Sequence, residues 1–323
     1  MLVRIAEEIL ENTLIRVEDK IRTGTFPTFL TIQVFVYLFF ISFILTIAAF
    51  VIMYYLVNFL IPNVNASLIT LLSLVVIVPI LTIVTARLIV WLLEGFRVDN
   101  LSQSLRKSFF VLFSLLGLFL GPFISSGYIL TLFQNSTPVL AQTSFVLPAI
   151  AQYFSISIPM FLKVLTHNLS VAGVLLLLAI FLGEDAFFIL LYNAVALATL
   201  ITDLLPKTDL AHAIANWLLF TIMSLPHMIP EFLGFLAFYL LGVYISFRYW
   251  EPLKEWLKEN GLLLRSEVYK ELEEEIDIIE RWQKKMSGYY VLMMFILGVI
   301  LIIVGAIIEV FVTAPIIRAI LKI

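Results

Sequence analysis

Hydrophobic residues occur in long runs along this chain, separated by short polar stretches. A helix needs about 20 apolar residues to cross the roughly 30 Å hydrocarbon core of a bilayer. The runs that meet this length lie at 29–61, 67–93, 108–133, 163–183, 186–205, 231–249 and 288–311. The pattern therefore predicts an all-α fold, a polytopic membrane bundle of about seven spans.

One further apolar run, at 210–224, is shorter than a comfortable span. We expect it to form a re-entrant or short helix that enters from the outer face and returns. If it crossed completely, the basic segment that follows residue 249 would lie on the outer side.

The distribution of Lys and Arg orients the predicted spans, because cytoplasmic loops are enriched in both. Loops 61–67 and 134–162 contain neither residue type, whereas segment 250–287 contains many. The arm before the first span and the second connection are also basic, with Arg4, Arg16, Lys20, Arg22, Arg97, Arg106 and Lys107. We therefore expect a multi-pass protein of the plasma membrane with a cytosolic N-terminus and an external C-terminus.

The spans and loops divide the chain into six predicted parts. Two amphipathic stretches show apolar residues at helical steps of three and four. The first stripe contains Val3, Ala6, Leu10, Leu14, Val17 and Ile21, and the second contains Leu264, Val268, Leu272, Ile276, Ile279, Trp282 and Met286. The parts are an N-terminal amphipathic cytosolic arm (1–28), a three-span unit (29–133), an extracellular loop with an interfacial helix (134–162), a core with the re-entrant turn (163–249), a charged cytosolic helix (250–287), and the last span with its tail (288–323).

Composition supports the lipid bilayer as the environment of this chain. Hydrophobic types make up 62% of the residues and charged types 13%, with a mean hydropathy of +1.08, against about 25% charged residues in soluble domains. A net charge of −3 excludes a nucleic-acid binder that works through bulk positive charge. Because the chain has no cysteine, disulfides, thiolate nucleophiles and Cys-ligated metals are excluded as well.

A few ionisable and amide side chains fall inside or beside the apolar runs, where each charged group costs about 2.5–3.5 kcal/mol on insertion scales. They are His167, Asn168, Asn193, His212, His227, Glu231 and Glu309. The predicted topology places the histidines and both glutamates in the outer-leaflet half, with Asn193 nearer the middle of the membrane. We therefore predict a polar cluster formed by these histidines and glutamates.

The segment LPHMIPE at 225–231 is the most distinctive local feature. Pro226 and Pro230 each suit the first turn of a helix, where the missing N–H costs nothing. If the helix begins at Pro226, His227 and Glu231 lie one turn apart on a common face. If it begins at Pro230, the histidine caps it from the loop. Both a hydrogen-bonded structural kink and a ligand or proton site remain open.

Known catalytic templates are absent from the sequence. There is no HExxH, GxSxG or P-loop motif, so we expect a non-enzymatic protein without a cofactor. Three histidines and a glutamate could bind zinc in principle. Their spacing matches no known ligand pattern, so we predict no metal. Glycines in the third and last spans predict close helix packing, at Gly117, Gly121, Gly127, Gly298 and Gly305.

Four blocks of the second half resemble the stage II sporulation protein M family of integral membrane proteins. They are THNLSVAGVLLLLAIFLGEDAF, LLYNAVALATL, LPHMIPEFLGFLAFYLLG and GAIIEVFVTAP, in that order within roughly 163–320. The matching positions are Asn168, Gly183, Asn193, Pro226, His227, Glu231, Glu309, Thr313 and Pro315. The chain departs from the family at Ala194 and Met228, where the family usually has glycine. The resemblance implies a multi-spanning protein with this polar core and, in endospore formers, an anchor that assembles cell-wall hydrolases.

Two functions from different classes are consistent with these features. The first, which the sequence favours, is a non-enzymatic membrane scaffold that recruits membrane protein partners, or builds a homo-oligomer, through helix 250–287 and loop 134–162. The second is a transporter or lipid-handling protein that uses the outer-leaflet cluster, because re-entrant segments beside intramembrane charge recur at transport sites.

Overall fold

The computed structural model describes residues 12–21, 23, 27–60, 66–95, 101–134, 156–204, 210–246 and 288–321. Within these ranges all regular structure is helical and no strand is present. The prediction of an all-α fold is confirmed. The bulk of the predicted extracellular loop (135–155) and the predicted cytosolic helix (250–287) lie outside the described residues.

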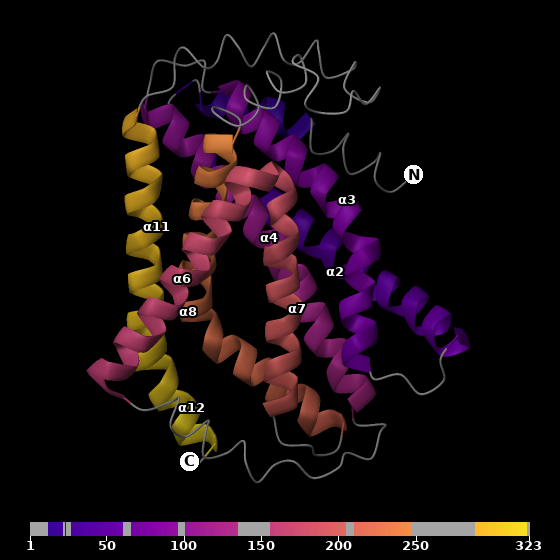
Figure 1. Cartoon of the computed structure of the whole chain (residues 1–323). Helices are drawn as coiled ribbons and strands as arrows, with labels where there is room; N and C mark the ends of the chain where they lie inside the picture. Colours follow the sequence, from indigo (N-terminus) through magenta and orange to yellow (C-terminus); the bar gives the residue numbers. More distant parts are fainter. Residues whose placement is uncertain are drawn as a thin grey trace, which may run out of the picture.

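A short helix at 12–21 precedes the long helices that form the body of the molecule (Figure 1). The elements that follow are α2 (Thr28–Leu60), α3 (Ala66–Gly95), α4 (Leu101–Gln134), α6 (Ile158–Leu182), the 3₁₀ turn η1 (Gly183–Ala186), α7 (Phe187–Leu204), α8 (Leu210–Ile245), α11 (Gly288–Ile308), the π-helix η4 (Glu309–Thr313) and α12 (Ala314–Leu321).

Five stretches of these helices are long and apolar enough to cross a membrane, which indicates a membrane protein. They are Thr28–Phe59, Gln103–Phe133, Ile158–Leu182, Leu210–Ile245 and Tyr290–Ile316. A bent pair in α3 would be a sixth, because Leu72–Val78 and Ile80–Ile89 meet at 42° around Pro79. The apolar part of α7, Phe187–Thr199, is shorter than a span. The predicted count of seven is therefore matched only in part.

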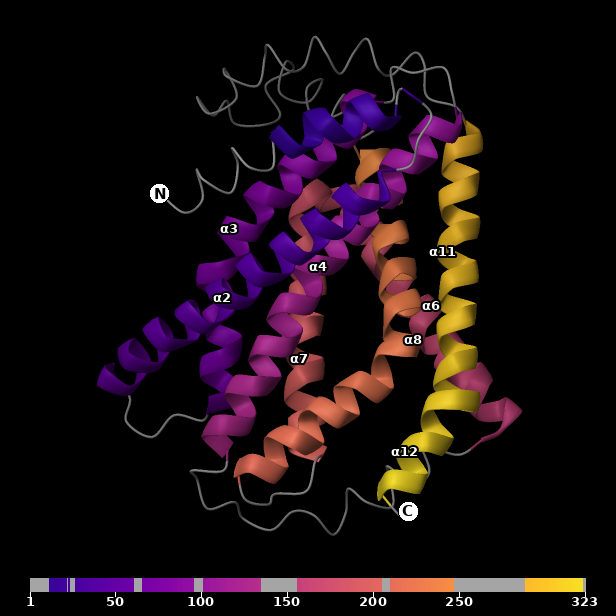
Figure 2. The same ribbon diagram turned by 180° about the vertical axis from the view of Figure 1, so that it is seen from behind.

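The predicted separation of 210–224 from the following span is wrong. Residues 210–245 form one continuous helix, α8, with Pro226 and Pro230 in its interior. Figure 2 shows that α8 changes direction partway along its length. A proline inside a helix removes one hydrogen bond and tilts the axis, but apolar residues on both sides allow the helix to continue. The LPHMIPE segment is therefore a bend within a helix, and not the first turn of one.

The predicted start of the fourth span at residue 163 is also displaced. Helix α6 begins at Ile158, because Ser157 accepts a hydrogen bond from the backbone N–H of Met160 at 3.2 Å and Pro159 occupies the first turn. A serine cap followed by proline is a favourable helix start. The end of the predicted loop 134–162 therefore belongs to α6.

The N-terminal stripe is confirmed where the structure describes it. Leu14, Val17 and Ile21 of the 12–21 helix are buried and belong to the main core. Glu18 of the same helix forms an ion pair with Lys107 of α4, and the Lys107 ammonium lies 4.8 Å from the centre of the Trp91 ring. This arm is therefore fixed to the bundle by apolar burial and by one buried cation.

Helix α4 forms the centre of the core, and its glycines confirm the predicted close packing. A Cβ at Gly117 would lie 2.6 Å from the carbonyl oxygen of Phe35 in α2. A Cβ at Gly121 would meet Ser42, and one at Gly127 would meet the Trp217 ring of α8. Helices α2 and α8 therefore approach α4 closely on different faces.

Candidate functional site

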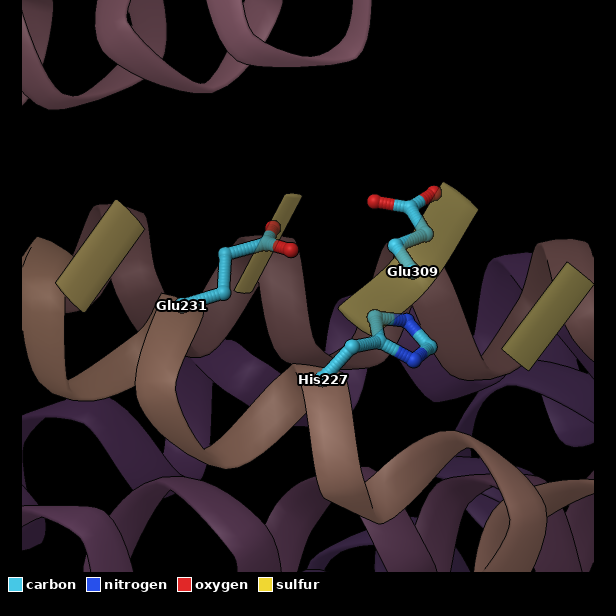
Figure 3. Close-up of side chains that lie close together, drawn as sticks. All are labelled: His227, Glu231 and Glu309. Atoms are coloured by element: carbon cyan, nitrogen blue, oxygen red, sulfur yellow. The ribbon is translucent and has the colours of Figure 1, made fainter. Parts of the chain in front are cut away.

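Three ionisable side chains from two separate parts of the chain meet beside the bend in α8. His227 and Glu231 come from α8, and Glu309 is the first residue of η4. One ligand atom from each residue lies within 4.8 Å of the others, and all three side chains are partly buried. Figure 3 shows the two carboxylates turned toward each other, with the imidazole beside Glu309.

The backbone of α8 explains why two of these groups share a face. His227 and Glu231 are four residues apart, and residues at this spacing lie one above the other on a helix. Pro226 and Pro230 lack the N–H that would donate to the carbonyl four residues earlier. The helix thus bends at the point where it presents both side chains.

Glu309 is positioned by a wide turn of the last span. The N–H of Ala314 donates to the carbonyl oxygen of Glu309, five residues earlier, and this bond defines the π-helix Glu309–Thr313. Single turns of π-helix inside α-helices are frequent at functional sites. Thr313 is buried, and its Oγ1 lies 3.1 Å from Nδ1 of His227. The widened turn therefore brings both Glu309 and Thr313 to the imidazole.

Small residues allow α11 to approach α8 at this level. A Cβ at Gly305 would lie 3.0 Å from the Glu231 Cβ and 3.2 Å from the His227 carbonyl oxygen. Further along, Gly234 and Gly298 face each other across the same interface, and a Cβ at Gly234 would lie 3.1 Å from the Gly298 carbonyl oxygen. The predicted packing role of Gly298 and Gly305 is confirmed, and it sets the distance between the two glutamates.

Asn168 of α6 supplies a further polar side chain. It is 5% exposed, and its amide interacts with the Glu231 carboxylate. Its Nδ2 nevertheless has no partner at good hydrogen-bond geometry within the described part of the chain. A buried amide in this state is unusual, because most buried polar atoms are paired with protein or water.

The other predicted site residues do not join this group. His167, Asn193 and His212 have exposed side chains. His167 is one residue before Asn168 and points about 100° away around α6. His212 is fifteen residues before His227, which is about 22 Å along the helix axis. The expectation that every histidine would converge is therefore wrong for two of the three.

Thr313 was named from the sequence only among the positions that resemble the family, and it was left out of the predicted polar cluster. A threonine in an apolar helix ordinarily bonds its own backbone, as Thr199 and Thr202 do here. The available signal was its spacing of four residues from Glu309, which places both on one side of a helix.

The arrangement favours a positive charge between the carboxylates. Two full negative charges 4.8 Å apart repel by about 3.5 kcal/mol at an effective dielectric constant of about 20. A proton or a cation held between them removes this repulsion. The imidazole, the carboxylates and the neighbouring amide are all groups that can bind a cation.

Comparisons with known proteins add no assignment to this geometry. No protein-family model matches the chain, and no curated protein or solved structure shows significant similarity to it. The function of the site must therefore be argued from its own residues.

Proposed function

We propose that this protein is a membrane transporter whose cation substrate binds at His227, Glu231 and Glu309. The observation that carries the proposal is the convergence of these three ligand groups within 4.8 Å, between two helices long enough to span a membrane. Ionisable residues inside the membrane region are costly and usually mark ion pathways or binding sites.

The form of α8 supports transport over a purely structural role. Broken or bent helices near the membrane midplane are a recurrent design of transporter binding sites, because they free backbone groups and allow one half to move. Here the bend contains Pro226 and Pro230, and His227 and Glu231 lie at the same level. A change of bend angle would alter the distance from Glu231 to Glu309.

The proposal includes seven crossings with a cytosolic N-terminus in a plasma membrane. Helices α3 and α7 then add two crossings to the five long spans. Figures 1 and 2 show α2 and α4 beginning, and α8 ending, toward the end of the bundle where α11 begins. The described basic residues Arg106 and Lys107, in the first turns of α4, belong to this end, which supports an orientation by the positive-inside rule. The proposed cation site then lies in the outer half of the bilayer.

The scaffold function and membership of the stage II sporulation protein M family remain hypotheses. The segment that carries the scaffold hypothesis, 250–287, lies outside the described residues. Its test is deletion of 262–286 followed by crosslinking, in which loss of assembly would support a scaffold. The transport proposal does not require this segment to bind a partner.

Flux in liposomes tests the proposal directly. The purified full chain is reconstituted with an internal cation indicator, and a cation or proton gradient is applied. We expect saturable flux that falls at least tenfold in Glu231→Gln and in Glu309→Gln, because each variant removes one of the paired charges. The matched control is Asn193→Ala, which alters an exposed polar residue of α7. Absence of flux from the native protein across all gradients would contradict transport. Flux equal to that of the native protein in a variant that carries both Glu231→Gln and Glu309→Gln would contradict it as well.

A further inference from the structure

We infer that the substrate bound at this site is a divalent first-row transition metal ion, of the Zn²⁺ or Mn²⁺ class, held by His227, Glu231 and Glu309 with Asn168 as an additional ligand. The inference rests on the proposed function, because it names the substrate of the same site. It makes a separate claim about chemistry, which can fail while transport stands.

The donor atoms select the class of metal. An imidazole nitrogen together with carboxylate oxygens suits zinc and its neighbours, whereas Mg²⁺ and Ca²⁺ prefer sites made of oxygen alone. An alkali ion binds through oxygen ligands and would need no imidazole. The presence of His227 among the three converging groups therefore points to a transition metal.

The hydrogen bond to Thr313 fixes the orientation of the histidine. A ligating histidine usually engages its other ring nitrogen in a second hydrogen bond, which sets the tautomer and the direction of the ring. Nδ1 of His227 lies 3.1 Å from Thr313 Oγ1, so Nε2 is the nitrogen left for a metal. In Figure 3 the ring lies beside the Glu309 side chain, with one nitrogen on the side of the carboxylates.

Asn168 is a further buried polar side chain beside the three groups, and its amide oxygen is the atom that could bind a cation. Its side chain is buried, it comes from a third helix, and its Nδ2 has no partner at good hydrogen-bond geometry within the described residues. It interacts with the Glu231 carboxylate, so it borders the space between the three groups. The amide oxygen would bind the ion, and the amide N–H would then donate a hydrogen bond to a carboxylate.

The spacing allows an ion with small side-chain movements. Zinc binds nitrogen and oxygen at about 2.0–2.2 Å, so neighbouring ligand atoms lie about 3–3.5 Å apart. Because the ligand atoms lie no more than 4.8 Å apart, each side chain would need to move inward by at most about 1 Å. Three strong ligands and one weak amide ligand would fill the four positions of a tetrahedral ion, and loss of the weak ligand would open one position for release.

Equilibrium metal binding to the purified full chain tests the inference. Zn²⁺ and Mn²⁺ are titrated against a chromophoric chelator, with Mg²⁺ and Ca²⁺ as competitors. We expect one tight site per chain that neither competitor displaces. Affinity should fall at least a hundredfold in His227→Ala, and about 10–100-fold in Thr313→Val, which keeps the shape but removes the hydroxyl partner of the imidazole.

Exposed histidines provide the matched controls. His167→Ala and His212→Ala should leave the tight site unchanged, because both side chains are exposed and outside the group. If His227→Ala does not fold, as judged by size-exclusion chromatography, Thr313→Val and Glu309→Gln decide the question. Unchanged affinity in those variants, displacement by Mg²⁺, or loss of the tight site in the control variants would overturn the inference.

The two proposals fail in different ways. Tight Zn²⁺ or Mn²⁺ binding that depends on His227, without flux in liposomes, would keep the metal site and remove the transport function. Flux of protons or alkali ions that depends on Glu231 and Glu309, without transition-metal binding, would keep transport and overturn the metal.

Discussion

Two regions of this protein remove ionisable side chains from water, and they do so in opposite ways. Where the N-terminal arm meets α4, a cation and an anion pair: Lys107 is 1% exposed, contacts Glu18 and lies over Trp91. Where α8 meets the last span, two carboxylates and an imidazole converge. The first region is neutralised by its own residues, whereas the second brings like charges together.

The difference separates a structural use of charge from a functional one. A buried pair of opposite charges fixes one arrangement, and breaking it is strongly destabilising. Like charges at short range destabilise the empty protein and favour whatever cation enters. The arm should therefore respond to mutation through stability alone, and the cluster through ligand binding.

Breaking the pair at the arm should give the largest change in stability. Lys107→Met removes the buried cation with which the Glu18 carboxylate, 20% exposed, is paired. We expect a loss of about 3 kcal/mol, the lower end of the range for buried pairs. Thermal unfolding in detergent measures it, with Lys107→Arg as the charge-preserving control. A shift no larger than that of the control would show that the pair contributes little.

Neutralising one glutamate of the cluster should raise the stability of the metal-free protein, whereas breaking the pair at the arm lowers stability. Glu231→Gln removes the repulsion between the glutamates, so at a pH high enough to ionise both carboxylates the metal-free protein should become more stable by about 2 kcal/mol, below the 3.5 kcal/mol Coulomb estimate. The same variant should lose most of the stabilisation that added Zn²⁺ gives to the native chain. Unfolding with and without a chelator separates both effects. Destabilisation of the chelated protein would mean that Glu231 serves structure.

The sequence predicted some of these features and not others. The apolar runs predict the helices well, since lipid leaves helices as the stable form for such runs. His227, Glu231 and Glu309 were predicted to gather because few ionisable groups fall within the spans. The continuity of α8 was not predicted, since two prolines in five residues indicate a helix start as readily as a bend.

The remaining errors arise because hydropathy does not determine how each helix is rotated or which helix it contacts. Whether His167 or Asn168 faces the bundle depends on the rotation of α6, and hydropathy is nearly uniform around such a helix. The partner of Lys107 could not be predicted either, because Glu18 lies in a separate helix with several other charged residues nearby. Contacts between helices could therefore be predicted from the sequence only where glycine required close packing or where the few ionisable groups within the spans had to meet.

A wider helix separation should weaken the cluster with a smaller effect on stability. Gly305→Ala places a Cβ 3.0 Å from the Glu231 Cβ and 3.1 Å from its backbone nitrogen. We expect a loss of about 1–2 kcal/mol from overpacking and weaker metal binding. The matched control is Gly173→Ala in α6, where no atom lies within 4 Å of the added Cβ. Equal behaviour of both variants in unfolding and binding would contradict this role of Gly305.

The smallest expected effect concerns a neutral contact near the arm. Tyr290→Phe removes the hydrogen bond between Tyr290 and Ser108 at 2.8 Å, while Ser108 retains its bond to the Ser104 carbonyl. We expect a loss of about 1 kcal/mol and unchanged metal affinity. Thermal unfolding and chelator titration of this variant measure how much an uncharged buried contact contributes to stability and to metal affinity. A loss as large as that of Lys107→Met would remove the distinction between charge and ordinary packing.

Anomalous X-ray diffraction from crystals of the full chain grown with Zn²⁺ tests the central claim most directly. We predict a peak at the zinc absorption edge about 2.0–2.2 Å from Nε2 of His227 and from carboxylate oxygens of Glu231 and Glu309. Zinc bound only at exposed groups such as His167 or His212, with the glutamates joined solely to protein groups, would contradict the assignment of this cluster as a metal site.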